Sequence, residues 1–250
     1  MNDFFYGLYY PFKCLNVLKN NKRLIKLSIV PVLINLLIYG TIFILVYKWA
    51  LVKSEQLTGA DSIHSLWWQE VLYVFIVIIS FIVIVIFCYL IFLFLSGIIT
   101  APFNEKISQV SEEIITGETL VSGTGFFKDL YSSSRDELIK LSFYFLVIFI
   151  FFLIGMIPLI GGIFSAIFGF LFSVFFCALD FLDYPMARKL LPLRKKISIV
   201  SRGGMLTFGF GLTSFILMFI PFLNVFTKPL LVISGTLLYY NKFDKKKRYN

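Results

Sequence analysis

A cluster of basic residues stands directly before the first long apolar stretch of the sequence. Lys22, Arg23 and Lys26 lie within about one helical turn of each other, ahead of the uncharged run at residues 27–47. The first turn of a helix has backbone N–H groups without helical partners and carries a partial positive charge. Either of the two asparagines before Lys22 can cap such a helix. The pattern is suited to binding an anion; the alternative is that these residues only orient an apolar helix.

Arrangements typical of enzymes and metal sites do not occur in the sequence. We find no Ser-His-Asp set, zinc-binding spacing or phosphate-binding glycine loop. His64 is the only histidine, and Cys14, Cys88 and Cys177 are too scattered to form metal-binding pairs. We therefore predict a protein that is not an enzyme, has no cofactor or metal, and does not hydrolyse ATP.

The composition indicates an integral membrane protein. Hydrophobic residues make up 59% of the 250 residues and charged residues only 15%, whereas about a quarter of the residues in a soluble domain are charged. A soluble fold of this length would leave large apolar patches in water. The net charge of +9 does not indicate nucleic-acid binding, because the basic residues stand in short clusters between long uncharged runs.

Long uncharged runs predict an all-α membrane fold that begins with two spanning helices. These lie at about residues 27–47 and 71–100, each long enough for the roughly 20 residues that a span needs. Trp67 and Trp68 precede the second span, where amphipathic aromatic residues favour the membrane interface. The polar segment 105–140 has apolar residues at helical spacing and predicts cytoplasmic amphipathic helices, the first of which ends at Gly117.

Two further apolar regions, residues 141–179 and 203–241, are each interrupted by proline. The interruptions read Ile157-Pro158-Leu159-Ile160-Gly161-Gly162 and Ile220-Pro221-Phe222-Leu223-Asn224. Proline breaks a helix and glycine permits a tight reversal, so both regions are predicted to form helical hairpins. Their arms are short for full spans, which favours short or re-entrant hairpins. We interpret residues 1–250 as a single membrane domain.

The positions of lysine and arginine predict the orientation in the membrane. If each hairpin returns to the side it left, one side carries the basic residues before the first span, in the loop 188–202 and in the tail 245–248. The opposite side carries only Lys48, Lys53 and Lys228. Because basic residues concentrate on the cytoplasmic side, both termini are predicted to be cytoplasmic.

Isolated polar residues in the apolar regions have a functional and a structural interpretation. They are Asn35, Asn104, Asp180, Asp183, Asn224 and Lys228. The two aspartates could couple transport to protons, but we favour a salt bridge to Arg188 or Arg135. Asn35 is interpreted as a hydrogen-bonding contact between helices and Asn104 as a helix cap. Lys228 either attracts anions at the outer mouth or extends to the headgroups.

The motifs, taken in order, resemble one known family. They are Pro31-x-x-x-Asn35, Ala101-Pro102-Phe103-Asn104, Arg135-x-Glu137, Ile157-Pro158-x-Ile160-Gly161, Asp183-Tyr184-Pro185, and Ile220-Pro221-x-Leu223-Asn224 with Pro229. This set, from about Phe4 to Asn241, is similar to the CysZ sulfate-permease family within the etoposide-induced protein 2.4 superfamily. The resemblance implies a bacterial inner-membrane homo-oligomer that mediates sulfate uptake.

The resemblance also implies which residues bind the anion. In that family a Gly-Leu-Arg-Arg stretch opens the first spanning helix and is implicated in sulfate binding. The matching positions here, aligned on Pro31, read Arg23-Leu24-Ile25-Lys26. The predicted substrate-binding residues are therefore Lys22, Arg23, Leu24 and Lys26. Arg23 and Ile25 replace the family's glycine and first arginine, which leaves the identity of the anion open.

The functional hypothesis is an inner-membrane transporter or channel for a small oxyanion, with sulfate uptake as the leading case. The hairpins broken by proline and glycine would form the path, as broken helices do in other transporters. The alternative is a non-transporting membrane scaffold that binds anionic lipid or a soluble partner through basic cytoplasmic loops, such as residues 194–196 and 245–248. A transporter for another anion is a third possibility.

Overall fold

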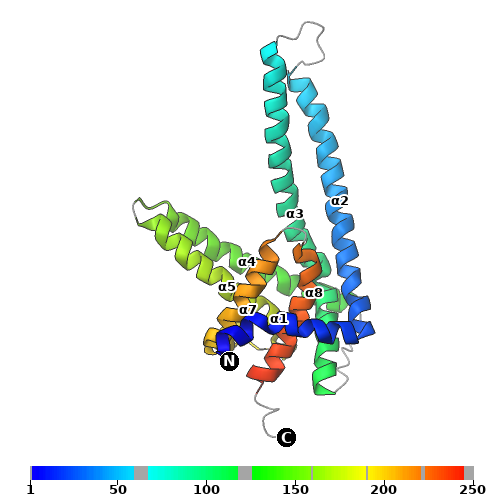
Figure 1. Cartoon of the computed structure of the whole chain (residues 1–250), viewed down its shortest axis with the longest axis vertical. Coiled ribbons are helices and arrows are strands. Elements are labelled where there is room, and N and C mark those ends of the chain that lie inside the picture. Colours follow the sequence, from blue (N-terminus) through cyan, green and yellow to red (C-terminus); the bar gives the residue numbers. More distant parts are fainter. Residues whose placement is uncertain are drawn as a thin grey trace. The chain divides into compact units, whose positions relative to one another are not determined.

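The computed structural model describes residues 2–58, 67–117, 126–158, 160–189, 191–220 and 223–244. Its elements, most of which are labelled in Figure 1, are α1 (Asp3–Asn20), α2 (Lys22–Thr58), α3 (Trp67–Thr116), α4 (Phe126–Gly155), α5 (Gly161–Arg188), α6 (Leu193–Arg202), α7 (Gly204–Phe219), α8 (Leu223–Leu238) and the π-helix η1 (Tyr239–Phe243). All regular structure in these ranges is helical, which confirms the predicted all-α class. His64 and the predicted basic tail lie outside the described residues.

The chain forms two compact units. One comprises Met1–Val32 and Ala101–Asn250, and the other comprises Leu33–Thr100. In the second unit α2 and α3 pack through aromatic rings, because Phe43 and Tyr47 each meet Phe81 edge-on. The prediction that the whole chain is one membrane domain stays a prediction.

Four described helical segments are long and apolar enough to cross a membrane. They are Lys22–Trp49, Val71–Cys88, Leu138–Gly155 and Gly161–Arg188. A fifth results if α6 and α7, which are bent by 101° at their junction, count as one broken span. Large apolar side chains on these segments point outward; Leu37 is 71% exposed and Phe152 is 62% exposed. Such surfaces need an apolar solvent, and a bilayer supplies it.

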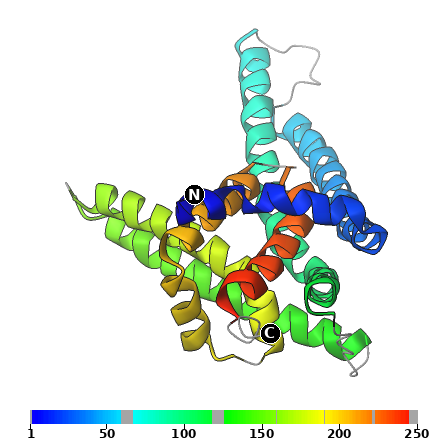
Figure 2. The same cartoon turned by 60° about the horizontal axis from the view of Figure 1, so that its bottom comes forward.

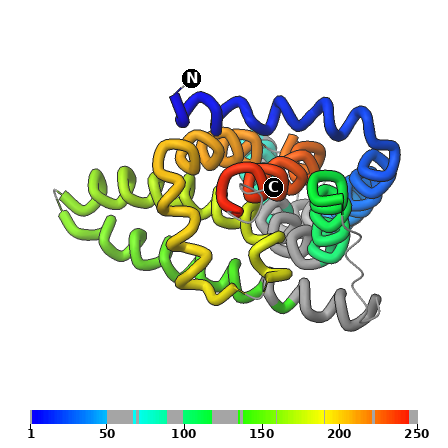
Figure 3. The backbone as a smooth tube through the Cα atoms, turned by 90° about the horizontal axis from the view of Figure 1, so that it is seen from below, coloured from blue at the N-terminus to red at the C-terminus, as the bar shows by residue number. Residues whose placement is uncertain are grey.

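The N-terminal helix α1 was not predicted from the sequence, and neither was α6, which lies in the predicted loop 188–202. Helix α1 packs on α7 and α8, along which it runs in Figure 3. The contact is close because a Cβ atom at Gly7 would overlap the carbonyl oxygen of Leu206, and one at Gly209 would overlap that of Phe4. The buried side of α1, including Tyr10 and Cys14, therefore belongs to the core that α5, α7 and α8 also form.

Helices α4 and α5 form a hairpin, seen in Figure 2 as the green and yellow-green pair. Helix α4 ends at Gly155 and α5 begins at Gly161, so the interruption overlaps the predicted break at residues 157–162. Ser165 donates a hydrogen bond to the Phe151 carbonyl across the pair at 2.6 Å. Both arms are longer than predicted. The expected amphipathic helix before Lys140 is continuous with the first arm, and α5 continues beyond Leu179 to Arg188.

Other boundaries follow local signals. Helix α3 continues through Pro102 and ends before Gly117, whose φ of +75° suits glycine; the predicted stop is confirmed. Helices α7 and α8 are separated at residues 220–222, inside the predicted second break. Gly204, with φ of +50°, starts α7 at the corner after α6.

Candidate functional site

The start of α2 is capped by Asn21. Its side-chain Oδ1 accepts hydrogen bonds from the backbone N–H groups of Arg23 at 3.0 Å and Leu24 at 3.2 Å. The cap resolves the choice between the two asparagines, because Asn20 is the last residue of α1. It also occupies two of the N–H groups that an anion at this terminus would use.

The basic side chains around this cap differ in their surroundings. Lys22 and Lys26 are exposed and lie one turn apart on the same face of α2. Arg23 is also exposed, but its guanidinium pairs with Glu113 of α3 at 2.8 Å. Leu24 is fully buried in the core and packs rather than facing solvent. The structure thus brings three of the four predicted residues to one exposed region, where Lys22 and Lys26 carry the charge that Glu113 does not balance.

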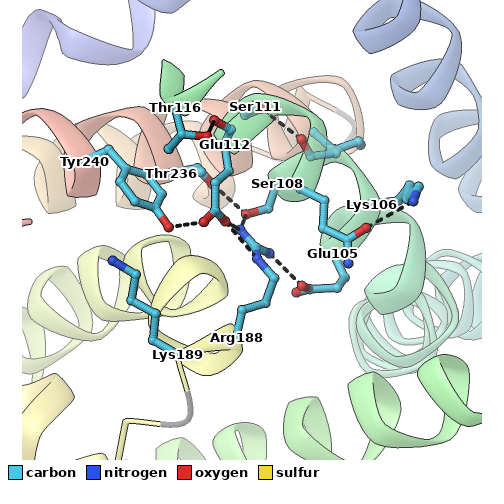
Figure 4. Close-up of polar contacts among 12 residues, drawn as sticks. Glu105, Lys106, Ser108, Ser111, Glu112, Thr116, Arg188, Lys189, Thr236 and Tyr240 are labelled. Carbon is cyan, nitrogen blue, oxygen red and sulfur yellow. Dashed lines mark hydrogen bonds and ion pairs between the residues drawn. The ribbon is translucent and has the colours of Figure 1, made fainter. Parts of the chain in front are cut away.

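A second group of charges is buried where α3, α5 and α8 meet. Figure 4 shows Arg188, from the end of α5, reaching between Glu105 and Glu112 of α3. Its Nη1 lies 2.5 Å from Glu105, and its Nε and Nη2 lie 2.9 and 2.5 Å from Glu112. Nη2 also donates to Ser108 Oγ at 2.9 Å. One guanidinium therefore neutralises two carboxylates, an arrangement that arginine's planar group of donors favours.

Neighbouring residues extend this Arg188 network to the C-terminal end of the chain. Ser108 and Thr236 of α8 are hydrogen-bonded at 2.7 Å, and the Tyr240 hydroxyl donates to Glu112. Burial raises the pKa of Glu105, while Arg188 opposes that shift. Burial and the hydrogen bond to Glu112 raise the pKa of the Tyr240 hydroxyl. The network holds three helices together through ionised and neutral groups.

The sequence analysis did not predict this network, although the spacing of polar residues in α3 indicates part of it. Glu105, Ser108 and Glu112 are spaced by three and four residues, so they lie on one face of a helix. A polar face of this kind predicts a partner from another element. The sequence around α3 does not identify that partner, because Arg188 lies 76 residues after Glu112.

A third group of charges lies at the polar end of the α4–α5 hairpin. Lys140 of α4 is 2.7 Å from Asp180 and 3.7 Å from Asp183, and Lys196 of α6 is 2.5 Å from Asp183. All four side chains are mostly buried. Salt bridges to the aspartates are thus confirmed, but the lysines make them.

The predicted arginine partners of these aspartates are wrong. Arg188 follows Asp183 by five residues, which turns it about 140° around the helix and directs it toward α3 instead. Arg135 is exposed on α4.

The remaining predicted polar residues lie inside the protein. Asn35, Asn104 and Asn224 are 3%, 1% and 3% exposed. The cap predicted for Asn104 is wrong, because α3 runs through this position without a break. Lys228 of α8 is partly buried and lies near enough to Asp180 for their charges to attract. Among the described residues no cluster of His, Cys, Asp and Glu could hold a metal ion.

Apolar helices with outward hydrophobic faces, and charged groups neutralised between them, define an α-helical, multi-pass integral membrane protein. The chain belongs to the family described as Sulfate transporter CysZ/Etoposide-induced protein 2.4, whose model matches residues 10–229. The resemblance stated from the motifs is confirmed.

Individual relatives agree with this membership. The chain is 25% identical over 218 residues to the protein named Sulfate transporter CysZ of Pectobacterium atrosepticum, covering 86% of this chain and 78% of the relative. It is 26% identical over 223 residues to the protein of the same name in Salmonella typhimurium, covering 87% and 85%. The family is one of transporters, which confirms the prediction that the chain is not an enzyme.

Proposed function

We propose that this protein carries a small oxyanion, sulfate in the leading case, across the bacterial inner membrane. The observation that carries the proposal is the family match over residues 10–229. It is joined by the alignment with relatives named as sulfate transporters, which covers most of the length of each relative. The exposed basic residues at the start of α2 support an anion as the substrate.

The geometry gives these basic residues a particular role. Lys22 and Lys26 are exposed, and Asn21 already occupies two helix N–H groups. Charges in contact with water attract an ion weakly and are screened by salt. We therefore assign Lys22 and Lys26 to recruiting the oxyanion at the entrance. Arg23 also has a structural role, because its salt bridge to Glu113 holds the start of α2 against α3.

The path and the assembly are further parts of the proposal. The breaks between α4 and α5 and between α7 and α8 supply the interrupted helices that line substrate paths in other transporters. We place both termini in the cytoplasm and expect the protein to act as a homo-oligomer, with the hairpins inserted as short or re-entrant elements.

Radiolabelled sulfate uptake into proteoliposomes tests this proposal. Uptake above empty liposomes should fall several-fold in a Lys22→Ala/Lys26→Ala variant, since each lost charge near the entrance lowers the local anion concentration. The matched control is Arg194→Ala/Lys195→Ala, which removes two exposed charges from α6. Arg23→Ala is measured separately, because it also releases Glu113.

Each outcome of the uptake experiment has a defined meaning. Loss in the α2 variant with uptake retained in the α6 control supports recruitment at the start of α2. Equal loss in both would indicate a general surface-charge effect and remove the assignment of Lys22 and Lys26. If folded, inserted wild-type protein takes up no sulfate, the sulfate proposal fails. Other oxyanions are then tested first, and the scaffold alternative after them.

A further inference from the structure

The outward face of α1 carries a row of exposed aromatic side chains. Phe5, Tyr9 and Phe12 are 48%, 56% and 47% exposed. Their spacing of four and three residues aligns them along one side of the helix. Gly7 and Cys14, which are buried, lie on the other side. Neighbouring aromatic rings that no other described part of the chain covers indicate a surface that meets something less polar than water.

The same line of residues becomes polar in the second half of α1. Asn16 and Lys19 follow Phe12 at intervals of four and three residues, and both are exposed. Lys13 is exposed beside the line, with its ammonium group 5.4 Å from the ring centre of Tyr6. Aromatic rings favour the boundary between hydrocarbon and headgroups, and lysine extends from there toward the headgroups. The face therefore has the composition of a helix that lies in the membrane interface.

Helix α1 packs on the open end of the α7–α8 hairpin, away from its tip. Leu206, near the start of α7, lies against Gly7. Asn241, just after the end of α8, donates a hydrogen bond to the Tyr10 hydroxyl at 2.7 Å. The tip is formed where α7 ends and α8 begins, at residues 220–222. In Figure 1, α1 lies over the lower parts of both helices.

The two ends of this hairpin differ in polarity. Phe219, Ile220 and Phe226 are exposed at the tip. The open end joins α6, which turns by 101° from α7 and carries the exposed Arg194 and Lys195. An apolar tip favours hydrocarbon, whereas basic residues favour the headgroups. The glycine contact and the Asn241 hydrogen bond thus hold α1 at the level where hydrocarbon meets headgroups.

We propose that the outward face of α1 docks on the lipid bilayer. Phe5, Tyr9 and Phe12 lie among the upper acyl chains, and Asn16 and Lys19 reach the headgroups. The lipid phosphates supply the negative charge that these lysines meet. A second copy of the chain suits the face less well, because the row contains no acidic residue that could pair with the lysines of the copy. The inference does not depend on the transported substrate.

Tryptophan fluorescence of the full-length protein tests the inference. Trp49, Trp67 and Trp68 are replaced by phenylalanine, and single tryptophans are introduced as Tyr9→Trp or Asn16→Trp. Asn16→Trp is the matched control, because it lies on the same face two turns further along α1. Each protein is reconstituted into vesicles of phosphatidylethanolamine and phosphatidylglycerol. The vesicles also contain phosphatidylcholine that is brominated in the upper part of its acyl chains.

The two positions should respond to different quenchers. Brominated lipid should quench Tyr9→Trp several-fold more strongly than Asn16→Trp, since only the first ring lies among acyl chains. Iodide in the water should quench Asn16→Trp and leave Tyr9→Trp nearly unchanged. Gel filtration confirms that each variant is folded. If the protein without its native tryptophans does not fold, the same quenching is measured as the difference between each variant and wild type.

Three results would overturn the proposal. Strong quenching of Tyr9→Trp by iodide would place the face in water. Protection of Tyr9→Trp from both quenchers would place it against protein, and cross-linking would then show whether a second copy covers it. Equal quenching of the two positions by brominated lipid would contradict the change from acyl chains to headgroups along the row.

Discussion

At the scale of single residues, Arg188 is the buried positive charge that two glutamates of α3 share. It is largely buried and satisfies two carboxylates and one hydroxyl on α3. Without it the largely buried Glu105 and Glu112 would both lose their positively charged partner, and buried charges without partners are costly. Tyr240 and Thr236 could not compensate, because they supply hydroxyl groups rather than a positive charge.

Arg188→Met is therefore expected to destabilise the protein by about 3–5 kcal/mol, the usual cost of removing one partner from a buried ion pair. The thermal midpoint of unfolding in detergent measures the effect. Arg194→Met, at an exposed position of α6, is the control and should unfold close to wild type. If both variants unfold at the wild-type temperature, Arg188 does not stabilise the junction of α3, α5 and α8.

At the scale of elements, the α1–α7 contact depends on missing side chains. Gly7 and Gly209 allow the two helices to approach so closely that each lies against a backbone carbonyl of the other. Backbone atoms cannot move aside as a flexible side chain can. The contact is thus specific to glycine at both positions, although both lie in helices where alanine is otherwise preferred.

Gly7→Ala should lower stability by about 1–3 kcal/mol, because the added methyl group forces α1 away from α7. The control is Gly40→Ala in α2, where the added carbon meets nothing within 4 Å apart from its own stretch of helix and alanine favours the helix. Thermal unfolding of the two variants beside wild type gives the comparison. A Gly7→Ala protein as stable as Gly40→Ala would contradict the close contact.

At the scale of the whole molecule, charged residues divide into a buried, paired group and an exposed group. Within the larger unit, Arg188 and the lysine–aspartate group are neutralised between helices, whereas Lys22, Lys26, Arg194 and Lys195 are exposed. Exposed basic residues near membrane segments favour the cytoplasmic side. The distribution supports the proposed orientation with both termini in the cytoplasm.

A reporter fused after the last residue tests that orientation. An enzyme reporter that is active only in the cytoplasm should be active in this fusion, and one that needs export should be inactive. The same pair of reporters inserted between α2 and α3, in the loop predicted to be external, should give the opposite result. A C-terminal fusion that reads as external would refute the proposed orientation.

The sequence alone determined the features that depend on neighbouring residues. Apolar runs predicted membrane helices, Gly117 predicted the end of α3, and the two proline-containing breaks fell between the helices where they were expected. The ordered motifs indicated the family that the comparison then showed. These signals are readable because helix length, helix ends and hydrophobicity are set by residues within a few turns of each other.

The tertiary structure decided which distant groups meet. Asp183 pairs with lysines rather than Arg188, Leu24 is buried beside the exposed basic residues, and Lys228 lies near Asp180. The docking of α1 likewise depends on a glycine contact between residues about 200 positions apart. Such pairings depend on how whole helices are rotated and packed. Small differences in the rotation per residue add up along a helix, and the sum determines which of its side chains face a neighbouring helix.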